Sequence, residues 1–185
     1  MTDAEQDPVM ERIGVAVNLG QAGDARAARR RFAEVWDEIG RDGDPIHRCA
    51  LAHYAADVQD DVKDELMWDL RALAAADEVT DERAQRYHGS LSVAGFYPSL
   101  HLNVADAYRR SGDRERACAH LRCAQEAIEA LADDGYGQMI RAGVARLADR
   151  LMDAAPIDDG TEAVELVPRD AHGREAGVRE PSGPT

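Results

Sequence analysis

The chain has 185 residues, and its 22 Lys plus Arg against 36 Asp plus Glu give a formal net charge of −14. This balance argues against DNA or RNA as a partner, because phosphate binding needs clustered cations and Lys63 is the only lysine. The length predicts one domain with a core that needs neither disulfides nor a metal. Aromatic residues make up only 5% of the chain and alanine is abundant, which favours an all-α fold.

The cysteines and the N-terminal segment predict a cytoplasmic protein. Cys49, Cys118 and Cys123 are too few for a secreted disulfide framework and leave one thiol over. The first residues are acidic where a signal peptide is basic, and no run of about 18 apolar residues occurs. We therefore expect neither export by that route nor an association with the membrane.

Four helices are predicted in the first half of the chain. Residues 1–7 are predicted to be disordered, and the first helix begins at Pro8 behind the capping residue Asp7. A turn at Gly23 and Asp24 starts a second helix, which ends at Ile39. Residues 46–58 form a third amphipathic stretch, and an acidic turn at 59–61 starts a fourth. The apolar side of this fourth helix is predicted to carry Leu66, Met67, Leu70 and Leu73.

The second half continues the pattern after an interruption. Residues 78–98 are polar and contain two glycines, which predicts an insert with one short helix. Helices over 100–108 and 117–131 then flank Gly112 and Asp113, and a last helix runs to about Met152. Residues 153–185 mix prolines and glycines with charges and are predicted to be a disordered tail. The helical domain is therefore expected over residues 8–152.

The helix pairs share a pattern of small and large apolar residues. Around Gly112 and Asp113 the third pair places Val104, Ala105, Tyr108, Ala117, Leu121 and Ala124. Around Gly23 and Asp24 the first pair places Val15, Ala16, Leu19, Ala28, Phe32 and Val35 at the same spacing. This pattern resembles the tetratricopeptide (TPR) repeat. The middle pair is degenerate, with Leu51, Ala52 and Ala55 in its first helix and Leu66, Leu70 and Leu73 in its second, after a turn about two residues longer.

The resemblance implies a TPR-like right-handed array of three antiparallel helix pairs with a C-terminal capping helix. It also implies that the first helix of each pair lines a concave groove that binds a peptide or protein segment. On this register Met10, Ile13 and Val17 face inward from the first pair, Cys49 from the second and Leu102 from the third. The predicted binding residues are His53, Asp57, Ser99, Asn103, Asp106 and Arg109.

Asn103 and Arg109 are suited to hydrogen-bond an extended peptide backbone and its carboxylate. Taken singly, Arg109 also reads as a solvated helix residue and Asn103 as a buried hydrogen bonder. The leading hypothesis is a non-enzymatic adaptor or regulator without a cofactor. Its acidic surface favours a basic protein or peptide partner.

Two other hypotheses remain open. A metal-dependent or small-ligand-binding enzyme would use His53, Asp57 and His101, and on a straight helix Asp61 would share their face. However, Asp61 is also the predicted N-cap of the next helix. A zinc site at Cys118, His120 and Cys123 is disfavoured, because residues two apart lie about 200° apart around a helix. The third hypothesis is a homodimer that buries an exposed helix pair.

Overall fold

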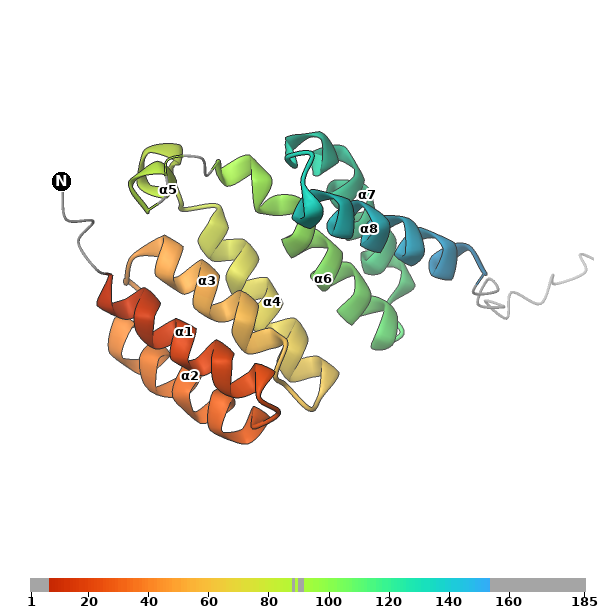
Figure 1. The fold of residues 1–185 in the computed structure, drawn as a ribbon. Coiled ribbons are helices and arrows are strands. Elements are labelled where there is room, and N and C mark those ends of the chain that lie inside the picture. The colour runs from red at the N-terminus through yellow and green to blue at the C-terminus, as the bar shows by residue number, and fades with distance from the viewer. Residues whose placement is uncertain (1–6, 88, 90–91, 154–185) are drawn as a thin grey trace, which may run out of the picture. The chain divides into compact units, whose positions relative to one another are not determined.

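The computed structural model describes residues 7–87, 89 and 92–153. These residues belong to one unit, residues 1–154, and a second unit, residues 155–185, lies outside the described part. The predicted N-terminal segment and tail therefore fall outside it, except for Asp7 and Asp153. The described residues form eight α-helices and no strand, which confirms the all-α prediction for this part of the chain (Figure 1). The helices are α1 (Pro8–Gln21), α2 (Ala25–Ile39), α3 (Pro45–Ala56), α4 (Val62–Ala76), α5 (Asp81–Tyr87), α6 (Tyr97–Arg110), α7 (Arg114–Ala127) and α8 (Gly135–Asp153), with short 3-10 turns at Val93–Gly95 and Ile128–Ala130.

Aspartates fix where most of these helices begin. The side chain of an N-cap residue accepts hydrogen bonds from backbone N–H groups that the first turn leaves free. Such caps precede α1, α2, α3, α4 and α7, at Asp7, Asp24, Asp44, Asp61 and Asp113. The cap predicted at Asp61 is confirmed, because its carboxylate accepts from the N–H of Lys63 at 2.7 Å.

The turns of the first and third pairs have the same geometry. Gly23 and Gly112 have φ of +89° and +86°, the left-handed region in which glycine is favoured. In each turn the glycine N–H donates to a carbonyl three residues earlier, and the aspartate N–H donates to one five residues earlier. Asp24 and Asp113 then cap the next helix through its third N–H group. The first and third pairs are therefore joined by turns of the same kind.

Three helix pairs form most of the packing: α1 with α2, α3 with α4, and α6 with α7. One core lies among α1 to α4, and a second lies among α6, α7 and α8. Helix α4 packs against α6 and thereby joins the two cores (Figure 1). The last helix, α8, packs on both α6 and α7.

The predicted apolar side of α4 is only partly correct: Leu66 and Leu73 are half-buried and pack against the cores. The buried residues of α4 are Trp68, Asp69, Ala72, Ala75 and Ala76. Met67 and Leu70, by contrast, are 40% and 37% exposed. The N-cap sets which residues of each helix are buried. Asp69 stands eight residues after the cap Asp61, and the buried Phe32 and Leu121 stand eight residues after their own caps.

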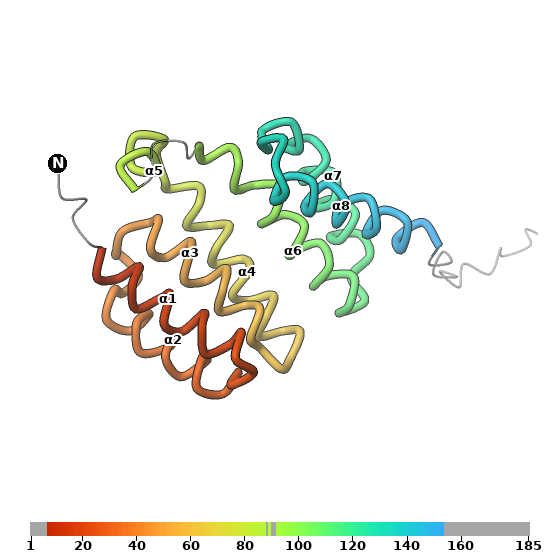
Figure 2. The backbone as a smooth tube through the Cα atoms, viewed as in Figure 1, coloured from red at the N-terminus to blue at the C-terminus, as the bar shows by residue number. Residues whose placement is uncertain are grey.

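The insert packs against the beginning of α3. Ile46 forms a small buried cluster with Val79 and Ala84, and Nε of Arg83 donates to Asp44 at 2.6 Å. Figure 2 shows α5 beside the start of α3. His53 and Asp57 stand near the other end of α3. None of the described helices is long and apolar enough to cross a bilayer.

Candidate binding site where α3, α4 and α6 meet

Polar side chains from three helices gather where the two cores join. Asp57 is the C-cap of α3, with His53 one turn earlier. Glu65 and Asp69 stand one turn apart on α4, and Asn103 and Arg110 lie on α6. Electrostatic or hydrogen-bonding interactions link them in a chain: His53 with Asp57, Asp57 with Glu65 and Asp69, and Asp69 with Asn103 and Arg110. We call these residues the polar cluster: His53, Asp57, Glu65, Asp69, Asn103 and Arg110.

Asp69 is the most deeply buried member of the polar cluster. Its exposed fraction is 1%, and neither carboxylate oxygen has a hydrogen-bond partner among the described residues. The pKa of Asp69 is raised to about 8, first by burial and then by the charges of Glu65 and Asp57, while Asn103 and Arg110 act in the opposite direction. Asn103 lies beside the carboxyl but not in hydrogen-bonding geometry. At neutral pH Asp69 is therefore mostly protonated.

The other two helix pairs carry no carboxyl at the position of Asp69. The equivalent residues Phe32 and Leu121 are buried core residues, with exposed fractions of 1% and 7%. Three residues further on, Val35, Ala72 and Ala124 are all fully buried. Asp69 thus occupies a core position that the other two pairs fill with an apolar side chain. The sequence analysis does not predict a buried Asp69, because it assigns Leu66, Leu70 and Leu73 to the buried side of α4. A register counted from the N-cap Asp61 places Asp69 at the buried position.

His53 and Asp57 bring further unpaired groups to the polar cluster. Nδ1 of His53 is buried and has no partner in the described part. Burial lowers the pKa of His53, although the charge of Asp57 opposes the shift. Burial raises the pKa of Asp57; the charge of His53 opposes this shift and the charge of Glu65 adds to it. Asp57 is exposed, yet the described residues place no Arg or Lys in an ion pair with it.

The arginines at the cluster are already engaged. The guanidinium of Arg110 donates to Glu65 and, through Nε, to Asp106 at 2.9 Å. Nε of Arg109 donates to the other oxygen of Asp106, also at 2.9 Å. Glu65 and Asp106 are therefore compensated, whereas Asp57 and Asp69 are not. Arg109, predicted to receive a partner's carboxylate, pairs within its own helix.

The other predicted residues lie in different surroundings. Ser99 is 6% exposed, and its hydroxyl donates to the carbonyl of Phe96. Cys49 lies in the first core, where burial raises the pKa of its thiol to about 12. Ile13 is also a core residue. Ser99, Cys49 and Ile13 therefore contribute to packing and leave His53, Asp57 and Asn103 as the predicted residues that meet in the cluster.

His101 contacts a different set of side chains. Its Nδ1 lies 3.0 Å from Nδ1 of His120, and its ring stacks on Tyr97 with the centroids 6.0 Å apart. Burial and the charge of His120 lower the pKa of His101, and burial lowers that of His120. Within the described residues no three His, Cys, Asp or Glu side chains are placed to hold a metal ion.

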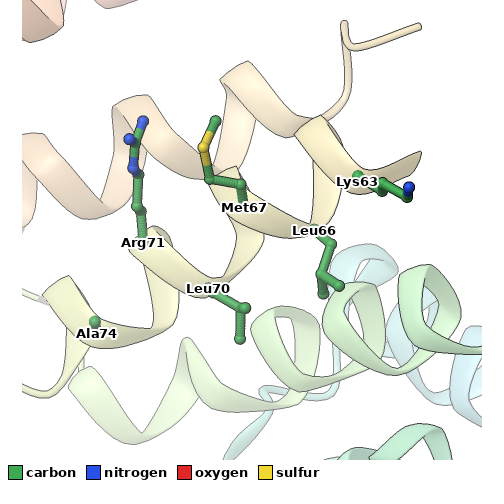
Figure 3. A pocket seen from close by; sticks show the side chains of 6 residues that line it. All are labelled: Lys63, Leu66, Met67, Leu70, Arg71 and Ala74. Atoms are coloured by element: carbon green, nitrogen blue, oxygen red, sulfur yellow. The ribbon is translucent and has the colours of Figure 1, made fainter. Parts of the chain in front are cut away.

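Another face of α4 is mostly apolar, unlike the polar cluster. It carries a shallow pocket of about 440 Å³, lined by Lys63, Leu66, Met67, Leu70, Arg71 and Ala74. Leu66 and Leu70 point toward α6, and Met67 and Arg71 point to the other side (Figure 3). The guanidinium carbon of Arg71 lies 4.5 Å from the centre of the Trp68 ring. Trp68 in turn packs edge-on against Trp36, as expected for a residue between helices.

Comparison with known proteins leaves the family open. No family model matches the chain, and neither the curated proteins nor the solved structures give a significant match.

Proposed function

We propose that this protein is a non-enzymatic interaction module that binds a segment of another protein at the polar cluster. The observation that carries the proposal is Asp69, a carboxyl with an exposed fraction of 1% and no hydrogen-bond partner in the described part. A buried polar group without a partner destabilises the folded state. Its presence at an apolar core position is most simply explained by a ligand that supplies the missing donors.

The repeat geometry supports a TPR-like arrangement of the helices. The first and third pairs share turn dihedrals, backbone hydrogen bonds and caps. α3 and α6 are the first helices of their pairs, and in a TPR-like array such helices face the ligand. They supply His53, Asp57 and Asn103 to the polar cluster.

The charge of the cluster favours a basic partner. Asp57 has no ion pair with Arg or Lys in the described part, and the whole chain carries a net charge of −14. Long-range attraction by this charge would accelerate the capture of a cationic segment.

Selection from a random-peptide display library tests this proposal. We expect selected peptides to bind the full chain, and the Asp57→Asn, Asn103→Ala double variant to bind them at least about tenfold more weakly. Asp64→Asn is the matched control, because Asp64 is an exposed acid on α4 outside the cluster. Failure to select any peptide, or equal binding by the double variant, would contradict the proposal.

A further inference from the structure

We propose that the polar cluster is a guanidinium site, in which Asp69, Asp57 and Asn103 receive the side chain of an arginine from the bound segment. The inference rests on the proposed function and names the group that the site recognises. It follows from which donors and acceptors in the cluster are used and which are free.

When Asp69 is ionised, the free groups in the cluster are acceptors. Both oxygens of Asp69 are unpaired within the described part. Asp57 has no ion pair there, and Nδ1 of His53 accepts when the imidazole proton is on Nε2. The arginine in the cluster, Arg110, already donates to Glu65 and Asp106. A ligand must therefore bring N–H donors and positive charge.

The geometry favours a guanidinium over a point charge. A carboxylate with two free oxygens accepts two parallel N–H bonds from the planar fork of a guanidinium. The remaining N–H groups would find the carbonyl oxygen of Asn103 and the carboxylate of Asp57. The described residues offer no three-ligand constellation for a metal ion.

The buried Asp69 interacts electrostatically with the exposed Asp57. Asp57 is exposed at the end of α3, whereas His53 and Asn103 are half-buried. Rotamer changes at such side chains are common when a partner binds, even where the backbone stays fixed. A cation would first meet Asp57 and then reach the buried carboxyl.

Binding would be coupled to the release of a proton. Asp69 keeps its proton at neutral pH because of its burial and the nearby charges of Glu65 and Asp57. Arg110 on α6 opposes this shift and also pairs with Glu65 and Asp106, while His53 on α3 interacts with Asp57. A guanidinium stabilises the carboxylate, so the proton passes to solvent and affinity rises with pH up to about 8.

The test uses three probes on the full chain: the N-acetyl methylamides of arginine, citrulline and lysine. Citrulline keeps the shape of arginine but lacks the charge. NMR shifts of the Asp69 carboxyl carbon and the Asn103 side-chain amide report binding. We expect a saturable response to the arginine probe that lowers the pKa of Asp69 by about 1 to 3 pH units. The response to citrulline should be absent, and that to lysine at least about tenfold weaker.

Two variants make the result specific. Asp69→Asn keeps the shape of the side chain and should bind the arginine probe at least about tenfold more weakly, while Asp64→Asn should bind it as the wild type does. Circular dichroism and thermal melting establish that Asp69→Asn is folded. Equal responses to arginine and citrulline, equal binding of lysine, or unchanged binding by Asp69→Asn would overturn the inference.

Testing the displayed peptides and the arginine probe on the same Asp69→Asn variant separates the guanidinium site from the segment-binding module. If displayed peptides bind but Asp69→Asn leaves their affinity unchanged, the module stands and the guanidinium site is refuted. If the arginine probe binds at Asp69 and no displayed peptide does, the guanidinium site stands and the segment-binding module is refuted.

Discussion

In α2 and α7 the eighth residue after the capping aspartate is an apolar core residue, Phe32 or Leu121, whereas in α4 it is Asp69. All three side chains are buried to a similar extent. The caps that set the register are also equivalent, at Asp24, Asp113 and Asp61 in turn. The same buried position is therefore apolar in two helix pairs and carries a carboxyl in the middle pair, where we propose that it serves recognition.

The largest effect is expected from placing a carboxyl at the equivalent position of the first pair. Phe32→Asp removes a fully buried ring and leaves a charge without a partner, so the free energy of unfolding should fall by at least about 4 kcal/mol. Ala33→Asp, at the exposed neighbouring position, should change it by less than about 1 kcal/mol. Urea unfolding measures both. Equal losses in the two variants would remove the basis of the comparison.

The reverse change should stabilise the middle pair. Asp69→Leu supplies the side chain found at Leu121, and we expect the free energy of unfolding to rise by about 1 to 3 kcal/mol near pH 8. Urea unfolding again provides the measurement, with Asp64→Leu on the exposed face as the control that should show no such gain. A loss of stability in Asp69→Leu would mean that the carboxyl contributes to the folded state.

The pH dependence of stability should reveal the raised pKa of Asp69. Folding raises its pKa from the ordinary 3.8 to about 8, so the folded state holds one more proton than the unfolded state between these values. Stability from this group therefore falls as pH rises through that interval and levels off above about pH 8. Relative to Asp69→Asn, the wild type should lose about 1.4 kcal/mol per pH unit between about pH 5 and 7.5. Parallel stability curves for the two proteins would contradict the assignment.

The third pair should respond to pH in the opposite sense and more weakly. Burial lowers the pKa of both His101 and His120, so the folded state favours their neutral forms. Their contribution is present above the ordinary pKa of 6.5 and is lost as pH falls below it. The melting temperature of the wild type should therefore fall on acidification more steeply than that of His120→Gln. A steeper fall in the variant would refute this.

The helices could be predicted from local signals because the caps and turns are local. Asp7, Asp24 and Asp61 mark helix starts by sequence alone, and Gly112 marks a turn that needs a left-handed residue. The helices themselves therefore lie close to the predicted ranges. The insert was expected to hold one short helix, which is α5.

The candidate site could be predicted only in part. His53, Asp57 and Asn103 were found from the repeat register of α3 and α6, but Asp69 and Arg110 were not. A polar residue normally lies on the exposed side of a helix, so Leu66 and Leu70 were assigned to the buried side of α4 in place of Asp69. The ion pairs that occupy Arg109 and Arg110 depend on Asp106 and on the approach of Glu65 from another helix, which sequence spacing alone does not reveal.

The most direct test of the account is the titration of the Asp69 carboxyl carbon by NMR in the full wild-type chain without ligand. An unpaired carboxyl buried at a core position should titrate near pH 8. A pKa near the ordinary 3.8 would contradict the account, because it would show that the carboxylate is already hydrated or paired and does not await a cationic partner.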